Sequence, residues 1–243
     1  MSARVAPAPI PALQLTGRAG NAVLTTAVWQ LLIESGANQA PHSGRTLQDH
    51  LLGTWHLLKS WGSSDSVCLA GLFHSIYGTN VFIRKCLLAA DRPKLRSAIG
   101  TDAEALTWLF CNIDRPSAIL QGLEQLPRLD KSPDAQLKDT CIELRQRRGH
   151  DKAIVPNLTP LQATPEQLCA LAQIECANLI EQGGWSVSLR DFYCAAIEYP
   201  VLNKSATAAL QGVWTRHAAQ RTAMAEPASS VPLTQHMTSE SNR

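Results

Sequence analysis

The pattern of hydrophobic and polar positions along the chain is helical almost throughout. Apolar residues recur three and four positions apart in segment after segment, and no stretch alternates convincingly between apolar and polar residues as a half-buried strand would. We therefore predict an all-α fold. The expected helices cover residues 18–35, 44–61, 66–76, 81–90, 92–100, 103–112, 115–123, 135–148, 165–182, 188–198 and 204–220.

Local motifs mark several helix ends. Thr164 followed by Pro165 and by Gln167 is typical of an N-cap with a capping box and a proline in the first turn. Ser43 is the expected N-cap of the helix over 44–61. The helix over 66–76 is apolar on nearly every side, which indicates a central, buried position.

The same pattern indicates one helical domain between two irregular ends. Residues 1–17 contain three prolines and no periodicity, so we expect an extended lead-in, and the domain then covers 18–222. Residues 223–243 are polar and rich in Ser and Thr, as a disordered C-terminal tail would be. The segment 149–163 contains Gly and Pro and is expected to be a long loop that covers a site.

Composition and charge narrow the range of partners. The 243 residues include 22 Lys and Arg against 20 Asp and Glu, and this near balance argues against nucleic acid as a partner. No apolar run approaches the length of a membrane span, so no membrane partner is expected. The seven cysteines include no CxxC pair and no secretory signal precedes them, which favours buried, reduced thiols and a cytoplasmic protein.

Candidate chemistry is concentrated on two consecutive helices. His50 stands near the start of one and His74 near the end of the next, with a glycine turn between them, so both imidazoles should meet at the same end of a helix hairpin. Two such imidazoles can converge on one metal ion. Glu175, in the apolar setting LCALAQIECANLIEQ, is a carboxylate that must lie at the edge of a buried face or be buried with a partner.

These residues carry a resemblance to a known family. A histidine, a stretch of helix, a glycine turn, the sequence AGLFHS and a late acidic residue in an LAxxExxN setting follow one another in residues 40–185. This order resembles the HD superfamily of helical metal-dependent phosphohydrolases, and it is most similar to the hydrolase domain of (p)ppGpp hydrolases. The stretch GLFHSIYGT also resembles an uncharacterised HD-like family in which Ser follows the His.

The resemblance implies a divalent metal site. His50 matches the first histidine of the family and His74 the histidine of the HD pair, while Glu175 matches the late aspartate, so these three would hold an ion such as Mn, Fe or Mg. The chain departs from the family after His74. Ser75 stands where HD proteins have Asp, and Tyr77-Gly78 stands where the (p)ppGpp hydrolases have an acidic pair.

Four further side chains are expected around the ligands. Ser75 and Tyr77 would lie behind the metal-binding groups. His42 and Arg45, just upstream of His50, would meet an anionic small-molecule substrate, because arginine binds phosphate through two hydrogen bonds.

Three functions follow as alternatives. The first is a metal-dependent hydrolase that acts on a small phosphorylated or nucleotide-like molecule. The second is a non-haem iron oxygenase, since two histidines and one carboxylate also suit Fe(II) with open positions. The third is a catalytically degenerate HD-like domain that binds a ligand or a protein. The sequence alone assigns no catalytic residue and no oligomeric state.

Overall fold

The computed structural model describes residues 24–126, 141–147, 159–183, 185–199 and 202–225. The expected lead-in over 1–17 and residues 226–243 of the expected tail lie outside these ranges, whereas residues 223–225 of that tail belong to the last helix. The described part is mainly helical, as predicted, with two small antiparallel sheets that the sequence did not predict. Its helices are α1 (Thr26–Glu34), α2 (Leu47–Ser60), α3 (Asp65–Leu72), α4 (Arg92–Ile99), α5 (Thr101–Asn112), α6 (Ser117–Glu124), α7 (Pro165–Glu181), α8 (Val187–Glu198) and α9 (Lys204–Ala225).

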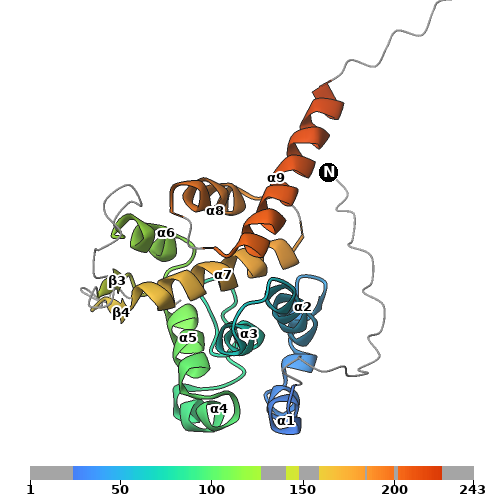
Figure 1. Cartoon of the computed structure of the whole chain (residues 1–243). Coiled ribbons are helices and arrows are strands. Elements are labelled where there is room, and N and C mark those ends of the chain that lie inside the picture. The colour runs from blue at the N-terminus through green and yellow to red at the C-terminus, as the bar shows by residue number, and fades with distance from the viewer. Residues whose placement is uncertain (1–23, 127–140, 148–158, 184, 200–201, 226–243) are drawn as a thin grey trace, which may run out of the picture.

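Helix α7 is the centre of the fold. It begins at the predicted cap: the Thr164 hydroxyl accepts the Gln167 N–H, and the Gln167 side chain accepts the Thr164 N–H in return. In Figure 1 it crosses the middle of the molecule, with α2, α3 and α5 on one side and α6, α8 and α9 on the other. Because helices cover it on both sides, α7 buries residues around most of its circumference.

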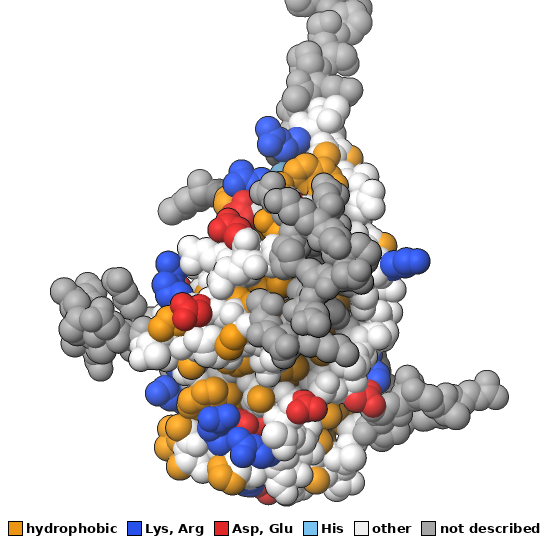
Figure 2. Space-filling model, turned by 60° about the vertical axis from the view of Figure 1, so that its left-hand side comes forward, with side chains coloured by type: hydrophobic (Ala, Val, Ile, Leu, Met, Phe, Trp, Pro, Cys, Tyr) orange, Lys and Arg blue, Asp and Glu red, His pale blue; other side chains and the backbone are white. Residues whose placement is uncertain are grey.

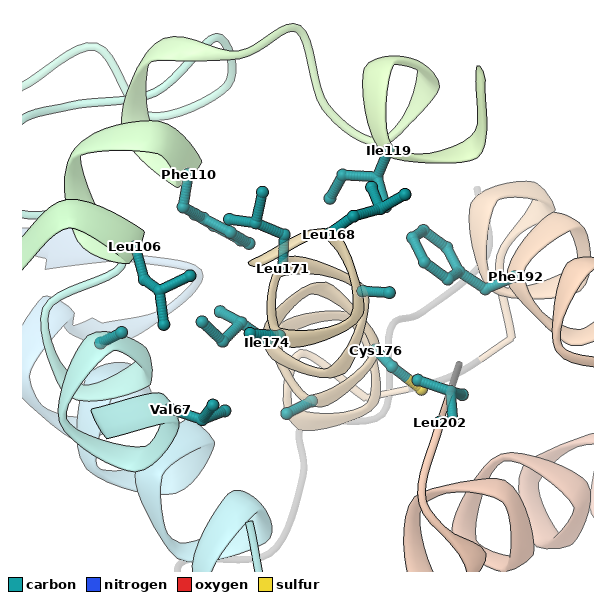
Figure 3. Packing of buried hydrophobic residues seen from close by; sticks show 14 of the residues in the cluster. Val67, Leu106, Phe110, Ile119, Leu168, Leu171, Ile174, Cys176, Phe192 and Leu202 are labelled. Carbon is teal, nitrogen blue, oxygen red and sulfur yellow. The ribbon is translucent and has the colours of Figure 1, made fainter. Parts of the chain in front are cut away.

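The core around α7 is aliphatic and aromatic. Leu171 and Ile174 face Leu106 and Phe110 of α5, while Cys176 on the other side of the helix lies near Leu202 (Figure 3). All of these side chains are at most 7% exposed. Burying a large apolar side chain stabilises a fold by roughly 1.5–3 kcal/mol, so this helix ties the two halves of the described structure together.

The segment before α2 is a β-hairpin and not the start of a helix. Strand β1 (Pro41–His42) pairs antiparallel with β2 (Arg45–Thr46), and Ser43 and Gly44 form the turn with φ angles of 47° and 84°. Ser43 is therefore not the cap that the sequence indicated. Thr46 caps α2 instead, through a capping box with Asp49.

Residues 81–90 do not form the predicted helix. The Thr79 hydroxyl accepts the backbone N–H groups of Val81 and Phe82, and the Ile76 carbonyl accepts those of Cys86 and Leu87. These bonds fix an irregular loop, which ends in a 3-10 turn, η2 (Ala89–Asp91). A second 3-10 turn, η1 (Ala37–Gln39), follows α1.

The second sheet replaces part of another predicted helix. The segment expected as a helix over 135–148 contains strand β3 (Ile142–Leu144), which pairs with β4 (Leu161–Ala163) in the segment expected as a loop. Ile142 and Leu144 are both fully buried and Glu143 between them is exposed, which is the alternation of an amphipathic strand. Three residues were too few for that period to outweigh the helical pattern of the neighbouring sequence.

Two further observations concern the cysteines and the possibility of a membrane-spanning helix. All seven cysteines are free, but Cys141 and Cys194 are exposed, so the expectation that every thiol is buried is wrong for these two. Among the described residues, no helix combines the length and apolar character needed to cross a membrane.

Candidate functional site

The two predicted histidines meet in the interior, between α2, α3 and α7. His50 lies in the first turns of α2, and His74 lies two residues past the end of α3 rather than in its last turn. Both side chains are completely buried, and their Nε2 atoms are 3.1 Å apart. The rings meet edge to face, with 4.9 Å between their centroids.

The Nδ1 atoms of both imidazoles are held by acceptors. Nδ1 of His74 lies 2.7 Å from the Gly71 carbonyl oxygen, which can only accept, so this nitrogen carries a proton. Nδ1 of His50 contacts Oε2 of Glu181, which is likewise an acceptor when the carboxylate is ionised. In this arrangement both imidazoles present an unprotonated Nε2 to each other.

The charge state of the two rings follows from their burial. Burial, and then the neighbouring His42 and Arg45, lower the pKa of His50 to about 3. Burial, and then His50, hold the pKa of His74 well below the ordinary value of 6.5. Both imidazoles are therefore neutral near pH 7, which is the protonation state that a metal ion requires of a histidine ligand.

A third acceptor comes from α7. The Oδ1 atom of Asn178 lies 3.1 Å from Nε2 of His50. Its orientation is fixed because the amide nitrogen donates to Oε2 of Glu175 at 3.2 Å, while Gln182 donates to Oδ1 at 3.0 Å. Asn178 was part of the LAxxExxN pattern but was not predicted as a site residue.

Glu175 lies one contact further away from the histidines than the sequence indicated. It is 2% exposed and its Oε2 atom forms an ion pair with Arg115, whose guanidinium also lies 4.0 Å above the Phe110 ring. The hydrogen bond from Asn178 is what connects it to His50. Among the described residues, no three His, Cys, Asp or Glu side chains come together as a metal-binding group.

Glu181 is the carboxylate that contacts His50, and the sequence reasoning missed it. It lies in the last turn of α7 and is 5% exposed at its side chain. A Cβ atom added at Gly53 of α2 would lie only 2.8 Å from Cγ of Glu181, so the absence of a side chain there makes room for this carboxylate. A glycine in the middle of a predicted helix was the signal that could have indicated a close approach.

The two predicted substrate residues lie on the β1–β2 hairpin that covers His50. The His42 ring stacks on the His50 ring with a centroid distance of 4.4 Å, and Phe82 meets the His42 ring edge to face. Nε2 of His42 is buried with no hydrogen-bond partner among the described residues. Arg45, whose side chain is one quarter exposed, forms an ion pair with Glu181.

Ser75 and Tyr77 are separated by the structure. Ser75 is buried directly after His74, and its carbonyl oxygen accepts the Gly78 N–H. Tyr77 instead points to Glu104, with 3.4 Å between its hydroxyl oxygen and Oε1, and it packs edge to face on Trp108. Its contacts therefore belong to a different buried cluster.

Three hydrogen-bond acceptors converge at the centre of the site, and this arrangement determines what the site can bind. Two neutral Nε2 atoms and one amide oxygen face one another, and on the tautomers above no protein hydrogen lies between them. Metal–nitrogen bonds of about 2.1 Å at angles between 90° and 109° would place two ligand nitrogens roughly 3.0–3.4 Å apart. The 3.1 Å separation fits that range, so the donor set and its spacing suit a divalent cation.

Comparisons with known proteins cover one side of this site. No curated protein and no solved structure shows a significant match to the chain. A family model described as a domain of unknown function, DUF6817, matches residues 31–115. The matched stretch contains both histidines, the hairpin with His42 and Arg45, and Arg115 at its end. Helix α7, which carries Glu175, Asn178 and Glu181, lies outside it.

Proposed function

We propose that this chain is an HD-like metal-dependent hydrolase for a small phosphorylated or nucleotide-like substrate. The observation that carries the proposal is the pair of neutral imidazoles whose Nε2 atoms face each other at 3.1 Å, each fixed through Nδ1 by an acceptor. A carboxylate or carbonyl behind each histidine is the usual support of a metal ligand. The placement of the two histidines on α2 and after α3, with α7 opposite, also supports the HD-like arrangement.

The residues have distinct roles in this proposal. His50 and His74 hold the ion, and α7 supplies oxygen from Asn178, with Glu175 hydrogen-bonded behind that amide. A divalent ion held there would supply Lewis-acid chemistry for phosphate-ester hydrolysis, by acidifying water and polarising a phosphoryl oxygen. Glu181 keeps the proton of His50 on Nδ1, and Arg115 balances the charge of Glu175.

Substrate access involves the hairpin. Both imidazoles are fully buried, so a substrate reaches them when the β1–β2 hairpin moves aside. Arg45 would then exchange its ion pair with Glu181 for one with the anionic group of the substrate. His42, whose ring lies against His50, would be uncovered in the same movement.

The proposal is tested by phosphate release. Metal-free protein is supplied with Mn²⁺, Mg²⁺ or Fe²⁺ under nitrogen and assayed on a panel of nucleotides and phosphomonoesters. We expect metal-dependent release by the wild type, and none above background by His74→Ala. Arg190→Ala, on the exposed far side of the fold, is the matched control and should retain full activity. Turnover that appears only with iron and oxygen would favour an oxygenase instead, and no turnover with any metal would contradict the proposal.

One observation favours a second candidate, the non-catalytic HD-like domain. Burial raises the pKa of Glu181, although Arg45 opposes this. If Glu181 is protonated, it can donate to Nδ1 of His50, and His50 then places its proton on Nε2, facing both His74 and Asn178. In that state the cluster is a closed hydrogen-bond network, which would stabilise the fold without binding metal.

A further inference from the structure

The loop between α3 and α4 exposes apolar side chains to an unusual degree. Val81 is 82% exposed, Ile83 is 60% exposed and Leu88 is 59% exposed. Half of the large, strongly exposed hydrophobic residues of the described structure belong to this one short segment. Apolar residues scattered singly over a surface need no explanation, but a cluster of them indicates an interaction site.

The backbone of this loop is fixed rather than loose. Thr79 holds its start through the N–H groups of Val81 and Phe82, and Ile76 holds its end through those of Cys86 and Leu87. Gly78 has a φ of 75°, and a Cβ there would press against the carbonyl oxygens of Ile83 and Arg84 at 3.2 Å. The hydrogen-bonded backbone of the loop therefore holds these apolar side chains in solvent, although their burial inside the protein would have been favourable.

Positive charge accompanies the apolar side chains. Residues 81–100 contain five of the 22 Lys and Arg and one of the 20 Asp and Glu. Arg92 and Arg96 pair with Glu104 and Lys94 pairs with Glu34, so the basic side chains left to meet a partner are Arg84 and Lys85 of the loop itself. Arg84 and Lys85 are exposed and have no ion-pair partner among the described residues. Figure 2 shows hydrophobic and basic side chains, with some acidic ones among them, at the lower end of the molecule, where α4 lies in Figure 1.

We propose that the 81–88 loop docks the protein on an anionic lipid surface. Projecting apolar side chains enter the boundary between headgroups and acyl chains, and the adjacent cations pair with the headgroups, each contributing on the order of 1 kcal/mol near an acidic leaflet. The chain as a whole is only net +2, so the positive charge that matters here is the local charge of Arg84 and Lys85. The expectation of no membrane partner rested on the absence of a spanning segment, which peripheral binding does not require.

The chemistry of the loop favours lipid over a protein partner. A protein-binding face has an apolar centre with charges at its rim, whereas here Arg84 and Lys85 stand between Ile83 and Leu88 in the sequence. That interleaving suits a lipid surface, where apolar tips insert and basic side chains stay at headgroup level. Phe82, within the same loop, contacts His42 over the candidate site, so docking would bring that site to the lipid surface.

The test is flotation of the full chain with lipid vesicles, which depends on neither metal nor turnover. We expect binding to phosphatidylcholine vesicles that contain phosphatidylserine, and weaker binding to pure phosphatidylcholine or at raised salt. The triple variant Val81→Ser, Ile83→Ser, Leu88→Ser should lose affinity at least about tenfold, and Arg84→Ala with Lys85→Ala a comparable amount. Because all five side chains are exposed, the variants should unfold at the temperature of the wild type.

A matched control separates this loop from exposed apolar surface in general. Val187 and Ile197 of α8 are 65% and 70% exposed, and Val187→Ser with Ile197→Ser should leave vesicle binding unchanged. Three results would overturn the proposal: no flotation of the wild type on acidic vesicles, flotation of the loop variant equal to the wild type, or an equal loss in the α8 control. A dimer in solution that the loop variant abolishes, without any lipid binding, would assign the loop to a second copy of the chain and also overturn it.

Discussion

The structure contains two buried polar clusters that differ in how their hydrogen-bond acceptors are paired. Glu104 of α5 is completely buried, and its two oxygens receive hydrogen bonds from Arg92 and Arg96 of α4 and from Tyr77. Each acceptor there has a donor. In the His50–His74 cluster, by contrast, three acceptors converge when Glu181 is ionised, and of these only the Asn178 oxygen has a donor, the amide of Gln182. Buried polar groups are almost always paired. The Glu104 cluster meets this rule with its own side chains, whereas the His50–His74 cluster needs a cation or an additional proton between its acceptors.

The surroundings of the two clusters sharpen this contrast. The arginines that pair with Glu104 are 30% and 46% exposed at their side chains, so they connect a buried carboxylate to solvent. Around the histidines, the side chains of Arg115 and Glu175 are 5% and 3% exposed. Two ions that are both out of water cost much to bury, so an enclosed pair of this kind adds little net stability over apolar residues of the same size.

The largest loss of stability is expected on substitution of Arg115. Arg115→Met leaves the Glu175 carboxylate buried without its cation, which should lower the free energy of unfolding by about 3–5 kcal/mol. Chemical denaturation measures the change. Arg190→Met, which removes an exposed pair with Asp191, is the control and should cost under about 1 kcal/mol. Equal losses in the two variants would mean that the ion pair beside the histidines is no more demanding than a surface pair.

A smaller effect is expected at Glu104, with a defined pH dependence. Burial alone would raise the pKa of Glu104, but the hydrogen bonds from Arg92 and Arg96 outweigh it, so the pKa is lowered from 4.5. A carboxyl group with a lowered pKa in the folded state contributes stability above its unfolded pKa and loses it as the pH falls through the folded value. Glu104→Gln should therefore cost about 2 kcal/mol near pH 7 and progressively less below pH 4.5.

Denaturation curves of wild type and Glu104→Gln between neutral and strongly acidic pH measure this difference. A difference that stays constant down to the acid limit would show that Glu104 contributes through packing and not through its charge. The cluster would then no longer serve as the satisfied counterpart of the histidine site.

The sequence indicated the histidine pair because its signals are local. Two histidines on successive helices across a glycine turn must come near each other, since a short turn makes neighbouring helices antiparallel. Glu181 was not found because a carboxylate in the last turn of a helix is ordinarily exposed, and only the contact with Gly53 across α2 and α7 changes that. Such a contact depends on the packing angle of two helices far apart in sequence.

Two other predictions from the sequence were wrong for specific structural reasons. The apolar run VFIRKCLLAA has the composition of a helix, but Thr79 and Ile76 take up the backbone donors of this segment and hold it as a loop. Tyr77 was placed near the metal ligands because it stands where the (p)ppGpp hydrolases have the first residue of an acidic pair. The chain leaves α3 at Leu72, so helical spacing no longer applies and Tyr77 turns toward Glu104.

The proposal that the two histidines hold a metal ion is tested by calorimetric titration of the metal-free protein with Mn²⁺, Fe²⁺ and Zn²⁺. We expect close to one equivalent in the wild type and no binding by His74→Ala. Glu181→Gln should bind about 10–100-fold more weakly, because a glutamine amide can donate to Nδ1 and move the His50 proton to Nε2. A wild type that takes up less than about a tenth of an equivalent of any of these ions would contradict the claim and leave the closed hydrogen-bond network as the explanation.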